Sequence, residues 1–368
     1  MPHGRETDPA VERWAGAGHS DDSDPARAGR AAVAAAITGD DPRLVLVFAS
    51  PRYSFEAVAT AAHGAAKTAE LIGCADAGEG VSAFALGGPG FSAATASAGC
   101  PDPRTAGEDA ARCLDGIDDQ LPHRALIVLA DPLAGDPQEV VRGAYSVAGA
   151  NVSLVGGCAG VQLRGDRVHR NSVVAAALGS SAPFGVGVRH GWRPVSEPLL
   201  VTASDGDWLE KLNDRPALDV YLECFAAPEG IEFKRFALRH PFGVAGARGR
   251  EAQIRAVVDA DFDSRTLRCN TEAAVGTLVW PMDGAPEAVL DATTLACEQA
   301  LTPLRGRPPL GLLAFDSVAR AGLGGARARI SAAAGDAPVG SLGTFGEIAR
   351  TSGSAGFHSH ALAVLAIG

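Results

Sequence analysis

The chain has 368 residues, 46% of them hydrophobic, with a formal charge of -11. This length exceeds what one hydrophobic core usually serves, so we expect two domains. The acidic balance argues against a nucleic-acid surface, because phosphate binding needs a positive face. The start lacks a charged segment followed by an apolar core, and no run of about 18 apolar residues can span a bilayer. We therefore expect a cytoplasmic protein that has no membrane or nucleic-acid partner.

The seven cysteines are an odd number, and none has the C-x-x-C spacing of a zinc site or a redox pair. Reduced thiols are the simplest interpretation in a cytoplasmic chain.

The beginning of the chain, residues 1–25, shows no hydrophobic periodicity, so we expect a disordered tail there. An alanine-rich helix follows and extends through Ile37. Asp24 suits the N-cap position and Pro25 suits the first helical turn.

Apolar runs then alternate with helical patterns through the first half of the chain, which indicates an α/β fold. Residues 81–99, split by a glycine-rich turn, predict a hairpin. A second hairpin is expected at 161–168. The run 71–75 resembles 154–159, since both are apolar strands that open into a loop of small residues. The remaining strands are expected at 44–49, 125–130, 172–178 and 184–188, and the helices at 54–68, 106–114 and 137–149.

A proline- and glycine-containing break at 191–198 places the domain boundary near residue 195, giving domains 26–195 and 196–368. The second half contains short strands between 251 and 280, typical of an antiparallel meander, and a long helix over 285–301. We predict two lobes, each a mixed sheet flanked by helices, with a ligand cleft between them.

Three apolar runs near the end of the chain each adjoin polar groups. The run 310–315 leads into Asp316 and Arg320, and the run 339–345 leads into Gly346 and Glu347. The run 357–367 opens with His358. Strands of one sheet bring their ends together, so we expect these side chains to share a pocket.

The order of these signatures resembles the FIST domain, in both its N-terminal and its C-terminal half, over roughly residues 30–368. The segments that resemble it are 44–50, 72–74, 78–79, 216–222, 240–243, 315–320, 343–350 and 356–358.

The resemblance implies an intracellular sensory module that binds a small ligand, such as an amino acid or small carboxylate, and signals through a separate partner protein. Haem with nitric oxide is the alternative that the family implies. This chain departs from the family pattern at Ser317, Ser359 and Ala361, which indicates an altered or lost ligand.

Two of the candidate ligand-binding residues are charged. Arg320 offers a planar fork suited to a ligand carboxylate, and Glu347 can receive a ligand ammonium. The alternatives are an ion pair of Arg320 with Asp316 or Glu347, and a capping role for Glu347.

His358 and His360 lie two residues apart and could chelate a metal, although no third ligand is identifiable, and a hydrogen-bonded structural His358 is the alternative. We expect His358 to be a pocket residue and expect no metal.

Cys74 lies in a loop of small residues near Glu79, with His63 upstream. A thiolate nucleophile is one interpretation, and a buried inert cysteine is the other. An enzyme that uses Cys74, or the pair Glu347 and His358, is therefore a second hypothesis. Cys158 has a similar glycine-rich setting, and both loops could supply N–H groups to an anion.

The sequence contains no dinucleotide fingerprint, Walker A loop or nucleophile elbow. His169 and His240 are haem-ligand candidates by residue type alone. We therefore expect no cofactor, and the sequence does not indicate an oligomeric state.

Overall fold

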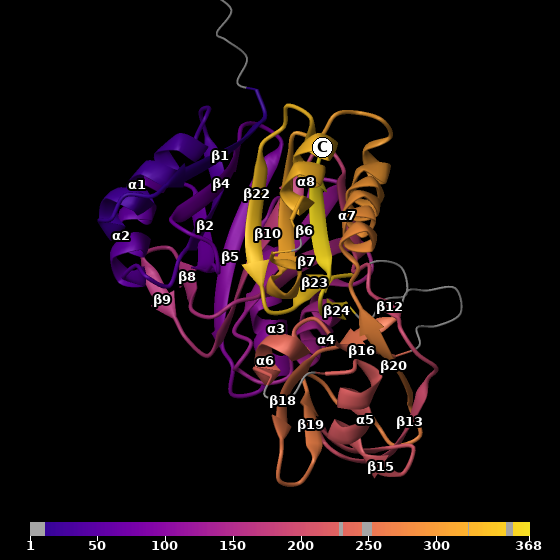
Figure 1. The fold of residues 1–368 in the computed structure, drawn as a ribbon. Coiled ribbons are helices and arrows are strands. Elements are labelled where there is room, and N and C mark those ends of the chain that lie inside the picture. Colours follow the sequence, from indigo (N-terminus) through magenta and orange to yellow (C-terminus); the bar gives the residue numbers. More distant parts are fainter. Residues whose placement is uncertain (1–11, 228–230, 245–251, 323, 351–355) are drawn as a thin grey trace, which may run out of the picture.

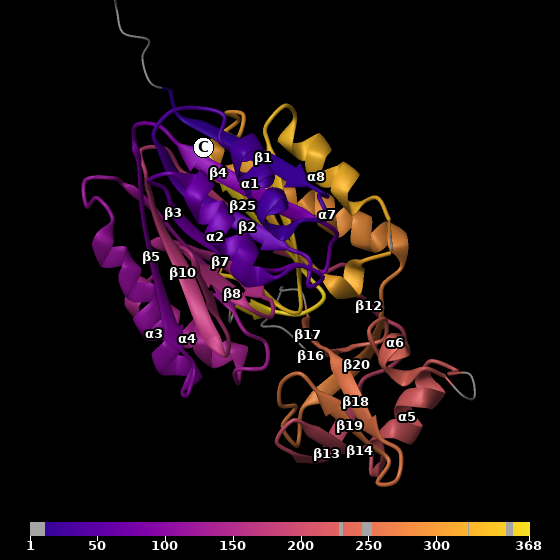
Figure 2. The same ribbon diagram turned by 90° about the vertical axis from the view of Figure 1, so that its left-hand side faces the viewer.

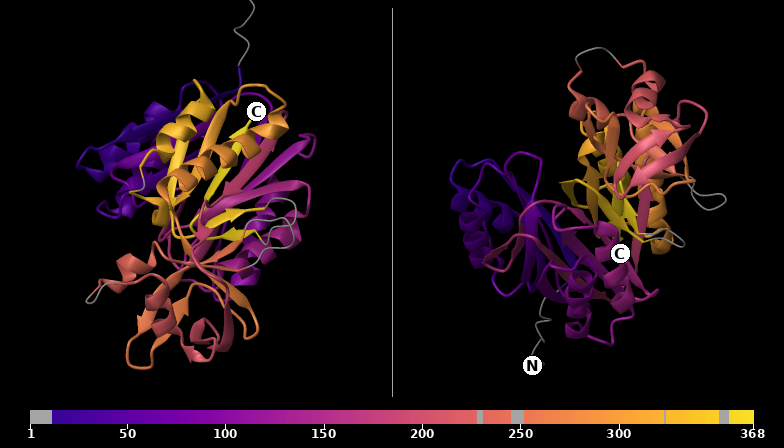
Figure 3. Two further views of the ribbon diagram at one scale, coloured as in Figure 1. Left: turned by 45° about the vertical axis from the view of Figure 1, so that its right-hand side comes forward. Right: turned by 90° about the horizontal axis from the view of Figure 1, so that it is seen from below.

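A computed structural model describes residues 12–227, 231–244, 252–322, 324–350 and 356–368. Three sheets that share one connectivity form the main body, and a small antiparallel barrel is set apart at one end of it (Figures 1 and 3).

The first unit of the main body consists of β1 (Trp14–Ser20), α1 (Pro25–Ala36), β2 (Pro42–Ala49), α2 (Phe55–Ala66), β3 (Glu70–Ala75) and β4 (Val81–Gly87). Its strands lie in the order β1-β4-β2-β3. Strands β2 and β3 are parallel and are connected through α2, while the other two pairs are antiparallel.

The second and third units repeat this arrangement. The second contains β5 (Phe91–Gly99), α3 (Pro103–Ala111), β6 (His123–Ala130), α4 (Pro137–Ala148), β7 (Val152–Cys158) and β10 (Ser172–Ser180). The third contains β11 (Phe184–Arg189), α7 (Pro286–Leu301), β21 (Gly311–Ser317), α8 (Ala326–Ala334), β22 (Val339–Thr344) and β25 (Leu362–Ile367). Their orders, β5-β10-β6-β7 and β11-β25-β21-β22, match that of the first unit.

The three units close into a ring. Strand β3 contacts β5 and β10 of the second unit, β7 contacts β11 and β25 of the third, and β22 contacts β1 and β4 of the first. The inner faces of all three sheets share one apolar core, which includes Phe48, Phe84, Leu129 and Phe315. Helix pairs α1/α2, α3/α4 and α7/α8 cover the outer faces (Figures 1 and 2).

Hairpins link neighbouring units. Strands β8 (Gln162–Arg164) and β9 (Arg167–His169) follow β7, and β8 extends the first sheet by pairing with β3. Strands β23 (Glu347–Ala349) and β24 (Phe357–His358) follow β22, and β23 extends the second sheet by pairing with β7. We call the boundary between the first and second units the first junction, that between the second and third units the second junction, and that between the third and first units the third junction. At the third junction the first unit has only the short loop of residues 76–80 between β3 and β4.

The side chain of Asp76 takes the place of that missing hairpin. At the end of β3 the Ala75 N–H donates to a carbonyl of the next unit, and at the end of β7 the Cys158 N–H does the same. The Gly343 N–H, at the equivalent position of β22, donates instead to the Asp76 carboxylate. The distances are 3.1 Å (Ala75 N to Gly160 O), 2.7 Å (Cys158 N to Gly346 O) and 2.9 Å (Gly343 N to Asp76 Oδ1).

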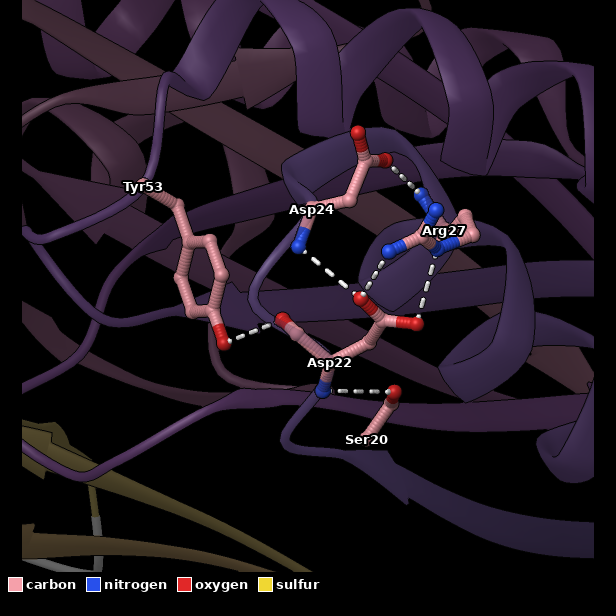
Figure 4. Close-up of polar contacts among 5 residues, drawn as sticks. All are labelled: Ser20, Asp22, Asp24, Arg27 and Tyr53. Atoms are coloured by element: carbon pink, nitrogen blue, oxygen red, sulfur yellow. Dashed lines mark hydrogen bonds and ion pairs between the residues drawn. The ribbon is translucent and has the colours of Figure 1, made fainter.

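The expected start of the first helix is confirmed. Asp24 is the N-cap of α1 and its carboxylate accepts from Arg27 N at 2.8 Å. Asp22 accepts from the Arg27 guanidinium at 2.9 and 3.0 Å, and its carbonyl accepts from the Tyr53 hydroxyl at 2.8 Å (Figure 4). The same Asp-Pro start precedes α3 and α4, where Asp102 and Asp136 are the N-caps.

The resemblance between residues 71–75 and 154–159 reflects their structure, because β3 and β7 are equivalent strands in the first two units. Gly73 and Gly156 occupy one position in the two units. A side chain at either position would collide with a carbonyl oxygen of the neighbouring parallel strand, that of Val47 or of Val128. The need for close backbone approach explains why glycine recurs there.

Two local predictions are wrong. A disordered tail does not extend to residue 25, because β1 forms within it and pairs with β4. This strand has no hydrophobic pattern since Gly16 and Gly18 press against the backbone of α1. Residues 81–99 do form two strands, but β4 and β5 belong to different sheets and do not form a hairpin; the glycine turn passes the chain between units.

The barrel forms one antiparallel sheet that nearly closes on itself. Its strands are β12 (Arg193–Pro194), β13 (Leu199–Asp205), β14 (Trp208–Leu212), β15 (Arg215–Pro216), β16 (Phe242–Val244), β17 (Gln253–Arg255), β18 (Val257–Asp261), β19 (Thr266–Cys269) and β20 (Leu278–Asp283). Helices α5 (Ala217–Cys224) and α6 (Phe233–Ala237) accompany them. Tyr221 is fully buried in a core that the barrel does not share with the sheets.

The predicted α/β class, with mixed sheets flanked by helices, is confirmed. The barrel and the third sheet are additions to the predicted two-lobe arrangement, and β11 and β25 join the two halves of the chain in one sheet. The division at residue 195 and the cleft between two lobes stay predictions. Among the helices that the structure describes, none has the length and apolar character needed to cross a bilayer.

Candidate functional site

Asp316 and Arg320 lie together at the end of β21, where η3 (Val318–Arg320) turns the chain. The Arg320 guanidinium donates to Asp316 Oδ1 at 2.6 Å, to the His190 carbonyl at 3.2 Å and to Thr293 Oγ1 at 2.5 Å. Its side chain is 0% exposed, against 24% for Asp316. The ion pair with Asp316, one of the alternatives from the sequence, is thus present, and protein acceptors surround the guanidinium.

Asp316 is the member of this pair that solvent reaches. Only its Oδ1 receives the guanidinium. Burial raises the pKa of the Asp316 carboxyl above its ordinary value, while the charge of Arg320 opposes that shift.

Glu347 lies at the start of β23 and is fully buried. Its two oxygens accept from the Thr344 hydroxyl at 2.7 Å and the Ala361 N–H at 2.9 Å. Burial raises the pKa of Glu347 to about 8, although both hydrogen bonds oppose the shift. The charges of Asp316 and Arg320 also act on this carboxyl, so the structure brings three of the predicted residues into one electrostatic group.

Gly346 and Cys158 lie next to this group, and Cys74 lies near Cys158. The Gly346 carbonyl accepts from Cys158 N at 2.7 Å. Cys74 and Cys158 are both 0% exposed, and burial raises the pKa of each thiol. A buried thiol with a raised pKa is a poor nucleophile, which favours the inert interpretation of Cys74.

His358 and His360 point to different partners. The Nε2 atom of His358 lies 2.9 Å from the Ala349 carbonyl, and that of His360 lies 3.0 Å from the Leu238 carbonyl in the barrel. Burial lowers the pKa of His360 to about 4. Within the described residues, no three His, Cys, Asp or Glu side chains gather as a metal site would need.

Glu79 lies apart from the buried group, since its side chain is exposed in the loop between β3 and β4. Asp76, at the start of the same loop, contacts the third unit by accepting a hydrogen bond from Gly343 N. Among the haem-ligand candidates, His240 stacks on Phe236 at 4.0 Å between ring centroids.

The group that we call the strand-end cluster consists of Asp316, Arg320, Thr344 and Glu347. It lies where the second and third units meet, at the carboxyl ends of their parallel strands. Such strand ends are the usual place for ligands in α/β folds. The cluster can offer an oxygen of Asp316 to a cation or donor, and a proton at Glu347.

Sequence reasoning missed the residues that hold this cluster. His190 and Thr293 lie 130 and 27 positions from Arg320, so no local pattern connects them. Gln162 was also missed: it is fully buried, on β8 at the position equivalent to Glu347 on β23. Its amide donates to Ala159 O at 2.6 Å and accepts from the Ser172 hydroxyl at 3.0 Å.

Two solved structures match this chain at low similarity. A cyanuric acid hydrolase from A. caulinodans has 12% sequence identity, covers 47% of this chain and 72% of its own, and gives a TM-score of 0.30. A chorismatase has 10% identity, covers 98% of this chain and 99% of its own, and gives a TM-score of 0.41. At these values neither bears on the activity of this chain. No curated protein matches.

Family models cover most of the chain. The FIST N domain matches residues 43–215, and the FIST C domain matches residues 217–350. The resemblance read from the sequence is confirmed, and the chain belongs to the FIST family.

Proposed function

We propose that this FIST protein is a sensory module that binds a small amino-acid-like ligand or carboxylate at the strand-end cluster and signals through a separate partner protein. The observation that carries the proposal is the fully buried carboxyl of Glu347, with its pKa raised to about 8, beside the ion pair of Asp316 and Arg320. Buried ionisable groups with strongly shifted pKa values gather at functional sites.

The ligand amino group binds at Asp316 in this proposal. Asp316 is the partly exposed acid of the cluster, and Arg320 holds one of its oxygens in place. The role of Arg320 is therefore to orient Asp316, since its own donors are already directed at protein acceptors. Loss of a proton from Glu347 gives the cluster a second charge state that a ligand can select.

Calorimetric titration of the full chain with amino acids and small carboxylates tests the proposal. We expect one class to bind, and Asp316→Asn to weaken it about tenfold or more, as removal of one charged partner does. Asp336→Asn, an exposed acid after α8, is the matched control. Binding that Asp316→Asn leaves unchanged would rule out this site, and the absence of any binding would rule out the sensory role.

An enzyme that uses Glu347 as a general acid and base is the second candidate, because a pKa near the working pH suits proton transfer. Incubation with metabolite mixtures and mass spectrometry separates the two, since only an enzyme consumes substrate over many turnovers. Turnover that survives Glu347→Gln would exclude this mechanism.

A further inference from the structure

A groove of about 530 Å³ opens between the second and third units, at the opposite end of β7 from the strand-end cluster. Val152 and Ser153 at the start of β7 line it, whereas Gly157 at the end of β7 pairs with Glu347. At a strand rise of roughly 3.3 Å per residue, Ser153 and Cys158 lie about 16 Å apart. The groove is therefore a separate place on the molecule.

The groove offers hydrogen-bond donors and no acid. Arg350 lies at its edge with its guanidinium 3.0 Å from the centre of the Tyr145 ring. The groove is also lined by two residues with hydroxyl groups, Tyr145 and Ser153, and by two with amide groups, Asn151 and Gln299. The Gln299 carbonyl already accepts from Val188 N and the Arg189 guanidinium, which leaves its NH₂ as the available group.

At the first junction, between the first and second units, an arginine in a similar position is connected to an acid through a threonine. There Arg164 on β8 donates to Thr95 at 3.2 and 2.8 Å, and the Thr95 hydroxyl donates to Glu70. The registers of β3, β7, β5 and β11 make Ser153 the equivalent of Glu70 and Val186 the equivalent of Thr95.

The second junction therefore has an arginine, Arg350, but has Ser153 in place of the acid Glu70. Arg350 comes one position later than Arg164 on the equivalent hairpin, as the backbone bonds of Arg350 to Leu154 and of Gly165 to Leu71 show. Among the described residues Arg350 forms no ion pair. A guanidinium that lines a groove without a carboxylate partner is suited to an oxyanion.

We propose that this groove binds a small organic anion, a carboxylate or a phosphate ester, whose oxyanion pairs with Arg350. The apolar part of the ligand lies against Phe184, Val186 and Pro303, which line the same groove. The volume is within the range of ordinary small-molecule sites. The inference does not depend on ligand binding at the strand-end cluster.

Isothermal titration of the full chain with benzoate, phenyl phosphate and the neutral benzamide tests the proposal. We expect one or both anions to bind in a one-to-one ratio and benzamide to bind about tenfold more weakly or worse. Arg350→Gln should weaken the anions by a similar factor, and Arg329→Gln, an exposed arginine on α8, should not.

A second variant is needed because Arg350→Gln could weaken anion binding simply by preventing the protein from folding. Ser153→Glu restores the acid that Glu70 supplies at the first junction, so it should pair with Arg350 and abolish anion binding without removing the guanidinium. Anion binding that persists equally in both variants would overturn the proposal, as would wild-type protein that binds neither anion. Asp316→Asn should leave anion binding intact, so a failure at the strand-end cluster is distinguishable from a failure here.

Discussion

Glu347 and Gln162 occupy equivalent positions at two junctions, but only Glu347 can titrate. Both are fully buried at equivalent places on hairpin strands, and both accept a hydrogen bond from a neighbouring hydroxyl. The amide of Gln162 remains uncharged at any pH. The carboxyl of Glu347 titrates instead, and burial moves its pKa to about 8. The difference between one acid and one amide therefore makes the second junction responsive to pH.

The contribution of Glu347 to the stability of the wild-type protein should decline as the pH rises from about 4.5 to about 8. Over that range the unfolded chain has lost the Glu347 proton while the folded chain keeps it, so the folded state binds more protons. This change in the pKa of Glu347 corresponds to roughly 5 kcal/mol as an upper limit. Urea unfolding across this range measures the slope.

Glu347→Gln should remove this decline, because glutamine accepts from Ala361 N and donates to the Thr344 hydroxyl without titrating. Glu298→Gln, an exposed acid on α7, should leave the slope unchanged. Parallel pH profiles for wild type and Glu347→Gln would mean that Glu347 is ionised in the folded protein throughout.

At the level of elements, the third junction is held by a side chain where the other two use backbone hairpins. Strand β22 presents its outer edge to the loop of residues 76–80, and Asp76 accepts from Gly343 N. The Asp76 carboxylate can replace a backbone carbonyl here because the oxygen of either group accepts a hydrogen bond from the strand N–H. This contact adds to the packing of β22 against β1 and β4 and to the shared apolar core at the boundary between the last and the first unit.

Asp76→Ala should lower the free energy of unfolding by about 1–3 kcal/mol, since it leaves the Gly343 N–H without its acceptor. Asp76→Asn keeps an oxygen acceptor and should cost much less. Denaturant unfolding measures both variants. Glu79→Ala, an exposed change in the same loop, is the control. An equal cost for Asp76→Ala and Asp76→Asn would show that charge, not acceptance, stabilises the junction.

At the scale of the whole molecule, the barrel has its own core and is tied to the ring through one small apolar cluster and a few polar contacts. The cluster consists of Trp192, Ile254, Met282 and Val289. Asn270 donates to Ser359 at 2.6 Å, and His360 reaches the Leu238 carbonyl at 3.0 Å. A small cluster and contacts of this kind contribute less than the large apolar core that the three sheets share. The barrel should therefore open more readily than the ring.

Leu212→Ala, in the barrel core, should cost about 2–5 kcal/mol. Hydrogen exchange should rise between residues 199 and 283 and stay unchanged in β6. Leu126→Ala, fully buried in β6, is the matched change within the ring and should raise exchange there. Exchange that rises equally in both parts after Leu212→Ala would show one cooperative unit.

Local chemistry alone determined several features that the sequence predicts correctly: the α1 start at Asp24 and Pro25, the hairpin turn at Gly165 and Asp166, and the strands β3 and β7 with their shared glycine. Each depends on residues a few positions apart. The FIST signatures likewise lie in short segments, so the family was readable from the sequence.

Only the tertiary structure decided which strands become neighbours and which polar groups meet. Two partners of Arg320, His190 just after β11 and Thr293 on α7, are distant from it in sequence. Their acceptors hold the guanidinium in a buried position, where it supports Asp316. Strand β1 has no hydrophobic pattern because Gly16 and Gly18 pack directly against the backbone of α1, where a side chain would not fit. Side-chain periodicity reports which face is buried, but pairing depends on contacts between distant segments, and no local pattern encodes them.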